Sequence, residues 1–125
     1  MQPIGRKSWV IPGGHIPLES TGREPTFTSN DLLCVLNAGG RMANLRMTLH
    51  YPMHDPVGPY PFTIAPERMR HIRFNDLIDP VSMPLEMDYA AVIESDVPVV
   101  VQFGRLNTAR KALATFSTLG FADDA

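Results

Sequence analysis

Apolar and polar side chains alternate along much of the chain. The clearest case is residues 44–51, where one side is apolar and the other polar (Leu45, Met47, Leu49 and Tyr51 against Asn44, Arg46, Thr48 and His50). A period of two is typical of a β-strand with one packed face and one wet face. We therefore expect a strand over residues 44–51 whose apolar side faces a core.

Similar alternation, or a short apolar run bounded by turn residues, predicts further strands over residues 6–11, 32–36, 60–64, 70–74, 89–94 and 97–103. Residues 32–36 are apolar on both faces, as in a strand covered on both sides, and turn residues 37–40 predict a hairpin into the next strand. Pro66 separates residues 60–64 from 70–74. We expect these two strands to lie side by side as a pair with a cationic rim.

The C-terminal stretch is ambiguous, and the remaining connections are rich in Gly and Pro. Ala109, Ala112, Leu113 and Phe116 have helical spacing, but residues 113–119 also suit a closing strand, which we favour after a short helical turn. Residues 15–28 are predicted to form a long connection. Seven to nine short strands indicate an antiparallel sandwich or barrel, and 125 residues with 44% hydrophobic content suit one domain over residues 1–125.

Charge and cysteine content narrow the function classes. A formal net charge of -2 and a pI near 6.0 argue against a dedicated DNA-binding protein, although a local basic patch could bind DNA weakly. The single cysteine, Cys34, lies in an apolar run and is expected to pack in the core, which fits a reducing cytoplasm. No apolar run approaches the roughly 20 residues of a membrane helix, so no membrane insertion is expected.

Histidines near residue 50 invite a metal-site interpretation. His50, His54, Asp55 and His71 could converge from neighbouring strands, but the close His-x-His pair of metal-binding barrels is absent. We expect solvent-facing histidines and neither a metal nor another cofactor. The paired carboxylates are assigned to a turn and to the chain terminus (Glu94 with Asp96, Asp123 with Asp124). No residue pattern specifies an enzyme.

One set of side chains has the composition of a binding surface: Trp9, His71, Arg73, Asn75, Asp76, Gln102 and Arg105. An aromatic platform with amide, carboxylate and arginine groups suits a sugar or a small anion. The alternative is structural. Trp9 would lie in the core, Arg73 would pair with an acidic neighbour, and Gln102 would satisfy a neighbouring strand, while Asn75 and Asp76 would cap a turn. Both interpretations remain open.

Two stretches, DPVGPY at residues 55–60 and HIRFNDL at residues 71–77, resemble the sensory rhodopsin transducer family. Shorter matching stretches, at residues 24–25, 34–39, 79–80, 97–102 and 105–106, extend the likeness over nearly the whole chain. The resemblance implies an eight-stranded antiparallel β-sandwich of jelly-roll type that forms a homotetramer in the cytoplasm. It also implies a non-enzymatic signalling module that docks on a membrane photoreceptor, with sugar or other small-ligand binding and DNA interaction as further suggestions.

Three hypotheses follow. In the first, the chain is a signalling adaptor that binds a membrane receptor. In the second, it is a small-ligand binder that uses Trp9 and the polar set between His71 and Gln102. In the third, it is a nucleic-acid-associated regulator that uses Arg68, Arg70 and Arg73. We favour the adaptor, acting by binding and not by catalysis.

Overall fold

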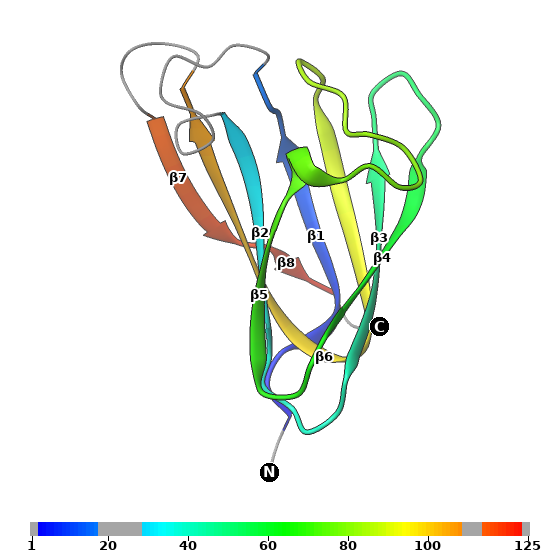
Figure 1. The fold of residues 1–125 in the computed structure, drawn as a ribbon, viewed down its shortest axis with the longest axis vertical. Helices are drawn as coiled ribbons and strands as arrows, with labels where there is room; N and C mark the ends of the chain where they lie inside the picture. The colour runs from blue at the N-terminus through cyan, green and yellow to red at the C-terminus, as the bar shows by residue number, and fades with distance from the viewer. Residues whose placement is uncertain (1–2, 18–28, 109–113, 124–125) are drawn as a thin grey trace.

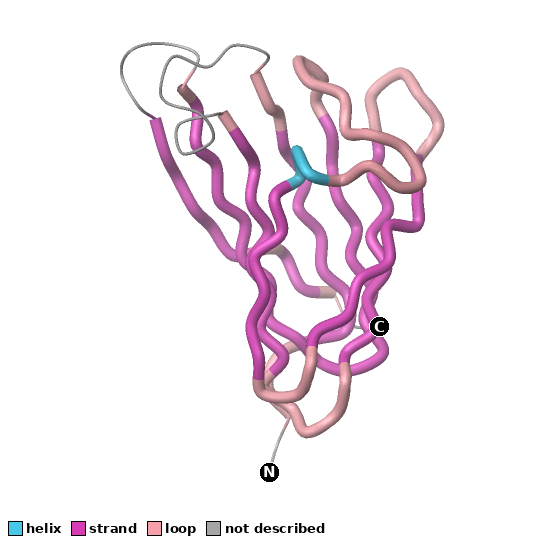
Figure 2. Tube along the Cα trace, in the orientation of Figure 1, coloured by secondary structure: helices cyan, strands magenta, loops and turns pink. Residues whose placement is uncertain are grey.

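The computed structural model describes residues 3–17, 29–108 and 114–123. They form eight strands and one 3-10 helix: β1 (Arg6–Gly14), β2 (Asn30–Asn37), β3 (Ala43–His50), β4 (Val57–Ile64), β5 (Arg68–Arg73), η1 (Phe74–Asp76), β6 (Tyr89–Asn107), β7 (Ala114–Leu119) and β8 (Phe121–Ala122). The strands pair antiparallel (Figures 1 and 2). The predicted antiparallel sandwich of about eight strands is confirmed.

Strand β6 organises the two layers because it belongs to both. Its first half pairs with β1 and β3, and its second half pairs with β2 and β7. The layers are therefore β4-β3-β6-β1-β8 and β5-β2-β6-β7. Pro98, which has no N–H to donate, lies between the two paired halves. In Figure 1, β6 descends from the upper end of the sandwich and climbs back on the other layer.

The core lies between the layers and is built from alternate residues of the strands. Leu45, Met47 and Leu49 of β3 are almost fully buried, as their period of two predicts. They meet the buried side chains of β2 and β6, and an aromatic cluster closes the core beneath η1. In that cluster the Phe74 ring lies 5.2 Å from the Tyr89 ring, measured between centroids. Burial of each large apolar side chain contributes about 1.5–3 kcal/mol.

The predicted hairpin over residues 32–51 is wrong. β2 pairs with β5 and β6, whereas β3 pairs with β4 and β6, so residues 38–42 carry the chain from one layer to the other. Turn residues specify a reversal of direction but do not specify which sheet the next strand joins. The outer side of β2 is also not covered: Leu32 and Cys34 are partly exposed, so Cys34 does not lie in the core as expected.

The predicted pairing of residues 60–64 with 70–74 is also wrong. β4 pairs with β3 and β5 pairs with β2, so the two strands are edges of opposite layers. Figure 1 shows these two green strands diverging from the turn that joins them at the lower end. Pro59 and Pro61 cannot donate to a ladder, which restricts β4 to an edge.

Two further predictions concern the later part of the chain. Residues 89–94 and 97–103 belong to one strand, β6, which continues to Asn107. The closing strand is confirmed by β7. Ala109, Ala112 and Leu113, whose spacing suggests a short helical turn before this strand, lie outside the described residues, as do residues 18–28 of the long connection.

Candidate functional site

Trp9 is a core residue that ties β1 to β6. Its side chain is only 6% exposed. Its indole N–H donates to the carbonyl oxygens of Arg6 and Val99, each at 3.0 Å. A ring held this way offers no platform to a ligand, so the geometry of Trp9 matches the structural interpretation.

Arg105 takes part in a buried polar network centred on Asp31, which is fully buried. Asp31 accepts hydrogen bonds from Arg105 Nε (3.0 Å), the Tyr89 hydroxyl (2.6 Å) and the backbone N–H of His15 (3.0 Å). Burial, together with the negative charge of Asp31, raises the pKa of the Tyr89 hydroxyl far above its usual range, so this hydroxyl stays protonated and donates. The network joins both ends of β6 to β2 and to the end of β1.

Three of the predicted residues share the outer face of the β5-β2-β6-β7 layer. Cys34 of β2 lies directly opposite His71 on one side and Gln102 on the other, and Leu32 lies opposite Arg73. Partial burial raises the pKa of the Cys34 thiol. No acidic neighbour pairs with Arg73 among the described residues, and its Nε is buried without a hydrogen-bond partner.

Asn75 and Asp76 lie in η1 at the upper end of the sandwich. The expected side-chain cap is not formed there. The Asn75 amide instead donates to the carbonyl oxygen of Ser29 at 2.9 Å, and Asp76 is exposed. The seven predicted residues therefore divide among the core, an outer sheet face and one end of the sandwich.

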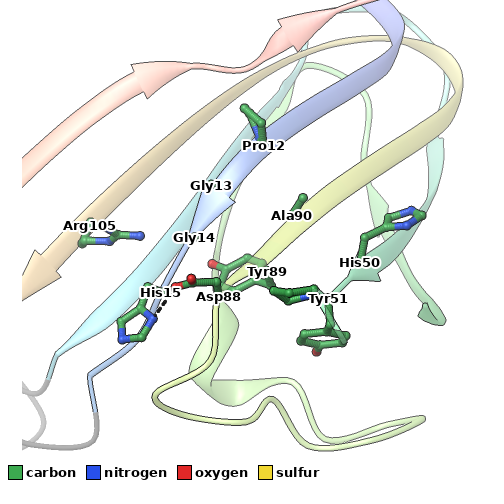
Figure 3. A pocket seen from close by; sticks show the side chains of 11 residues that line it. Pro12, Gly13, Gly14, His15, His50, Tyr51, Asp88, Tyr89, Ala90 and Arg105 are labelled. Carbon is green, nitrogen blue, oxygen red and sulfur yellow. Dashed lines mark hydrogen bonds and ion pairs between the residues drawn. The ribbon is translucent and has the colours of Figure 1, made fainter. Parts of the chain in front are cut away.

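A cleft of about 520 Å³ opens at the upper end, where β1, β3 and β6 end or begin (Figure 3). His15, His50, Asp88 and Arg105 contribute its polar groups. His15 Nδ1 lies 2.8 Å from an Asp88 oxygen, and its Nε2 lies 3.4 Å from a Glu86 oxygen. The histidines of the metal hypothesis do not converge: His50 lines this cleft, His54 packs edge-on against Tyr51, and His71 is on the sheet face.

A second feature of the upper end is a surface formed by residues 51–56 and 76–88, which we call the acidic loop face. It carries five carboxylates and no Lys or Arg (Asp55, Asp76, Asp79, Glu86 and Asp88). Four large apolar side chains on it are between 40% and 89% exposed (Met53, Ile78, Val81 and Leu85). An apolar hollow of about 230 Å³ lies beside Val81 and is lined by Tyr51, His54, Val57, Val81, Ser82, Pro84 and Met87.

Specific contacts hold the acidic loop face on the sandwich. The Tyr60 hydroxyl donates to the carbonyl oxygen of Val81 at 2.7 Å, and the backbone N–H of Glu86 donates to the carbonyl oxygen of Ile16 at 2.8 Å. Met83 is buried beneath the loop. Pro80 and Pro84 predict only a connection over residues 79–88. Residues 76–88 contain four acidic residues and several large apolar residues but no basic residue, and this composition is the sequence feature that marks the surface.

Comparison with known proteins identifies the family. Residues 4–122 match the sequence model of the family described as Anabaena sensory rhodopsin transducer. The chain belongs to this family. The structure of the Anabaena sensory rhodopsin transducer is similar at 44% identity and a TM-score of 0.74, covering 82% of this chain and 97% of that one. No curated protein matches the chain.

A second solved structure supports the same fold. The crystal structure of Thermotoga maritima 1070 is similar at 29% identity with a TM-score of 0.84, and the match covers 96% of this chain and 97% of that one. The resemblance seen in residues 55–60 and 71–77 is thus confirmed, and the chain is a transducer-like module. Within its described part, no helix is long and apolar enough to cross a membrane.

Proposed function

We propose that this chain relays the state of a membrane receptor by docking on it through the acidic loop face. Membership of the transducer family supports a receptor partner such as a rhodopsin. The observation that carries the choice of surface is its charge, because the cytoplasmic loops of membrane proteins are rich in Lys and Arg. A surface with five carboxylates and no Lys or Arg complements such loops.

The apolar side chains of the acidic loop face supply the contact itself. Exposed apolar side chains gathered in one place mark interaction sites, and anchors that fill pockets dominate binding energies. Ile78 is 73% exposed, so a partner can cover most of its surface. The hollow beside Val81 can accept an apolar side chain of the receptor. Carboxylates around the rim would speed the encounter and set its orientation.

The role is binding and not catalysis, and the compartment is the cytoplasm. Family membership supports a signalling role, and the lone Cys34 fits a reducing environment.

The test uses a detergent-solubilised sensory rhodopsin as the receptor probe and measures its affinity for the full chain. Ile78→Asp places a charge in the centre of the contact and is expected to weaken binding at least tenfold. Asp76→Asn with Asp79→Asn is expected to slow association and reduce its salt dependence. Glu94→Gln, on the outer side of β6, is the control. Unchanged affinity in Ile78→Asp would refute the docking surface.

The chain is also proposed to form a homo-oligomer, with the tetramer of the family as the expected state. β7 and β8 are edges of opposite layers that follow one another in the chain, and Leu119 and Phe121 on them are each 65% exposed. Unpaired edges with apolar side chains favour pairing with another copy. Light scattering should show a smaller particle for Leu119→Asp with Phe121→Asp. Ile78→Asp, which replaces another exposed apolar side chain far from these two strands in the sequence, should keep the mass of the parent protein.

A second candidate function is small-ligand binding in the cleft of Figure 3. The observation that favours it is that two imidazoles, a carboxylate and an arginine line one cleft of about 520 Å³, a size suited to a sugar. Calorimetry against a panel of sugars tests it. Loss of binding in His50→Ala but not in Arg46→Ala would support the cleft, and the absence of any bound sugar would reject this candidate.

A further inference from the structure

Strand β5 carries positive charges on both of its faces at an open edge of the sandwich. It pairs with β2 alone among the described strands, and residues 68–71 are all exposed. Arg68, Arg70 and Arg73 with His71 lie on this six-residue strand. We call these four residues the cationic edge.

The charges of the cationic edge are not compensated locally. Arg68 Nη1 donates to the carbonyl oxygen of Glu67 at 3.0 Å, and Arg70 Nη1 donates to the carbonyl oxygen of Thr63 at 3.1 Å. These bonds position the guanidinium groups without neutralising them. No carboxylate of the described residues forms an ion pair with Arg68, Arg70 or Arg73. Residues 57–75 hold three arginines and one glutamate, which leaves two positive charges on a chain whose net charge is -2.

Apolar side chains lie beside His71 and Arg73 on the outer face of the sheet, whereas Arg68 and Arg70 project from the other face of the same edge strand. Met69 is 55% exposed and lies directly opposite Leu36 of β2, which is 41% exposed. The strand that precedes β5 in the chain, β4, carries no charged residue. An open edge with arginines and a small apolar contact has the composition of a surface that lies against lipid headgroups.

We propose that the cationic edge binds the anionic phospholipid surface of a membrane. The leaflet that faces the cytoplasm carries anionic lipids, and each Lys or Arg close to it strengthens binding by about fivefold. Three arginines therefore raise partition onto that surface on the order of a hundredfold. β5 leads through η1 into the acidic loop face, so the two surfaces adjoin. Lipid contact would hold the chain near a receptor embedded in the same membrane.

Two other anionic or membrane-borne partners fit less well. The cytoplasmic loops of receptors are themselves basic and would repel the arginines. Duplex DNA binds through many phosphate contacts, and three arginines would neutralise about three phosphates, fewer than the roughly 6–10 of a typical salt-sensitive DNA complex. A phosphate backbone offers no apolar surface to bury the exposed Met69 and Leu36, whereas a lipid interface can cover them.

The test is co-sedimentation of the full chain with receptor-free vesicles. Vesicles of phosphatidylcholine with roughly one-third phosphatidylglycerol are compared with phosphatidylcholine alone, at low and high salt. We expect binding to the anionic vesicles alone, lost at high salt. R68Q with R70Q should reduce it about 25-fold, and addition of R73Q should reduce it on the order of a hundredfold. Both variants are checked for unchanged thermal unfolding, and the double variant avoids the partly buried Arg73.

The matched control is R6Q with R41Q and R46Q, which also removes three arginine charges, all of them exposed and on other strands and loops. It should lower vesicle binding less than fivefold. The proposal is overturned by equal binding to neutral vesicles, by no binding to anionic ones, or by an equal loss in the control. It is also overturned if duplex DNA binds more tightly than the vesicles and that binding falls in the same variants. Because the vesicles hold no receptor, failure here is separate from failure of receptor docking.

Discussion

Replacement of Asp31 by asparagine tests whether one buried carboxylate holds the upper end of the sandwich together. The asparagine side chain keeps the size of the aspartate but has one acceptor oxygen in place of two. It cannot accept from Arg105, Tyr89 and the His15 backbone as the carboxylate does at 2.6–3.0 Å. It also removes the negative charge that faces the Arg105 guanidinium.

The magnitude follows from burial. Removing one member of a buried ion pair costs about 3–5 kcal/mol of unfolding free energy. The side chain of Arg105 is 23% exposed and keeps part of its hydration, which places the loss near the lower limit, about 3 kcal/mol. For a chain of this size, a loss of that order lowers the Tm by about 10 °C.

Urea and thermal unfolding followed by far-ultraviolet circular dichroism measure the loss. The control is Asp96→Asn, because Asp96 accepts two 2.8 Å hydrogen bonds from Asn44 but is exposed. Exposed polar contacts contribute about 0–1 kcal/mol, so the control should change little. A loss in Asp31→Asn no larger than in the control would show that the reasoning about the buried network is wrong.

Three other substitutions probe the structure. Tyr89→Phe should make the free energy of unfolding depend less on pH in the alkaline range. The pKa of Tyr89 is raised in the folded protein, so its contribution to stability is intact below the unfolded value of 10.0 and falls above it. Unfolding titrations at several pH values would measure this difference. Gly14→Ala would place a methyl carbon 2.1 Å from the Tyr89 ring and should cost about 1–3 kcal/mol or more in urea unfolding. Trp9→Phe removes the donor to two carbonyl groups and should cost about 1–3 kcal/mol without altering vesicle or receptor binding, since Trp9 is buried.

Strand positions were predictable from the sequence because burial of one face imposes a period of two. Leu45, Met47 and Leu49 illustrate this, since each is buried as expected. Strand partners were not predictable. The turn over residues 37–40 has the composition of a hairpin, yet the chain crosses between layers there, and β3 pairs with β4 and β6. Alternation alone carries no information about which strand lies beside which.

The candidate site shows a similar division. Residue type singled out His71, Arg73 and Gln102, and the structure places these three on one sheet face. The same reasoning could not place Trp9 or Arg105, because side chains able to bind a ligand can equally satisfy buried backbone or carboxylate groups. The acidic loop face lacks any periodic pattern, so only the folded structure shows that its two segments, residues 51–56 and 76–88, together line an apolar hollow.

The path of β6 has a mechanical consequence. Tyr89 and Arg105 lie near the two ends of this 19-residue strand, and both donate hydrogen bonds to Asp31. One carboxylate therefore holds the two ends of the strand together. Loss of these hydrogen bonds to Asp31 would separate both layers at the upper end of the sandwich in a single event, while the lower end stays packed. Amide hydrogens flanking Tyr89, Arg105 and Asp31 should then exchange with solvent at a common rate, because they become accessible in the same local opening.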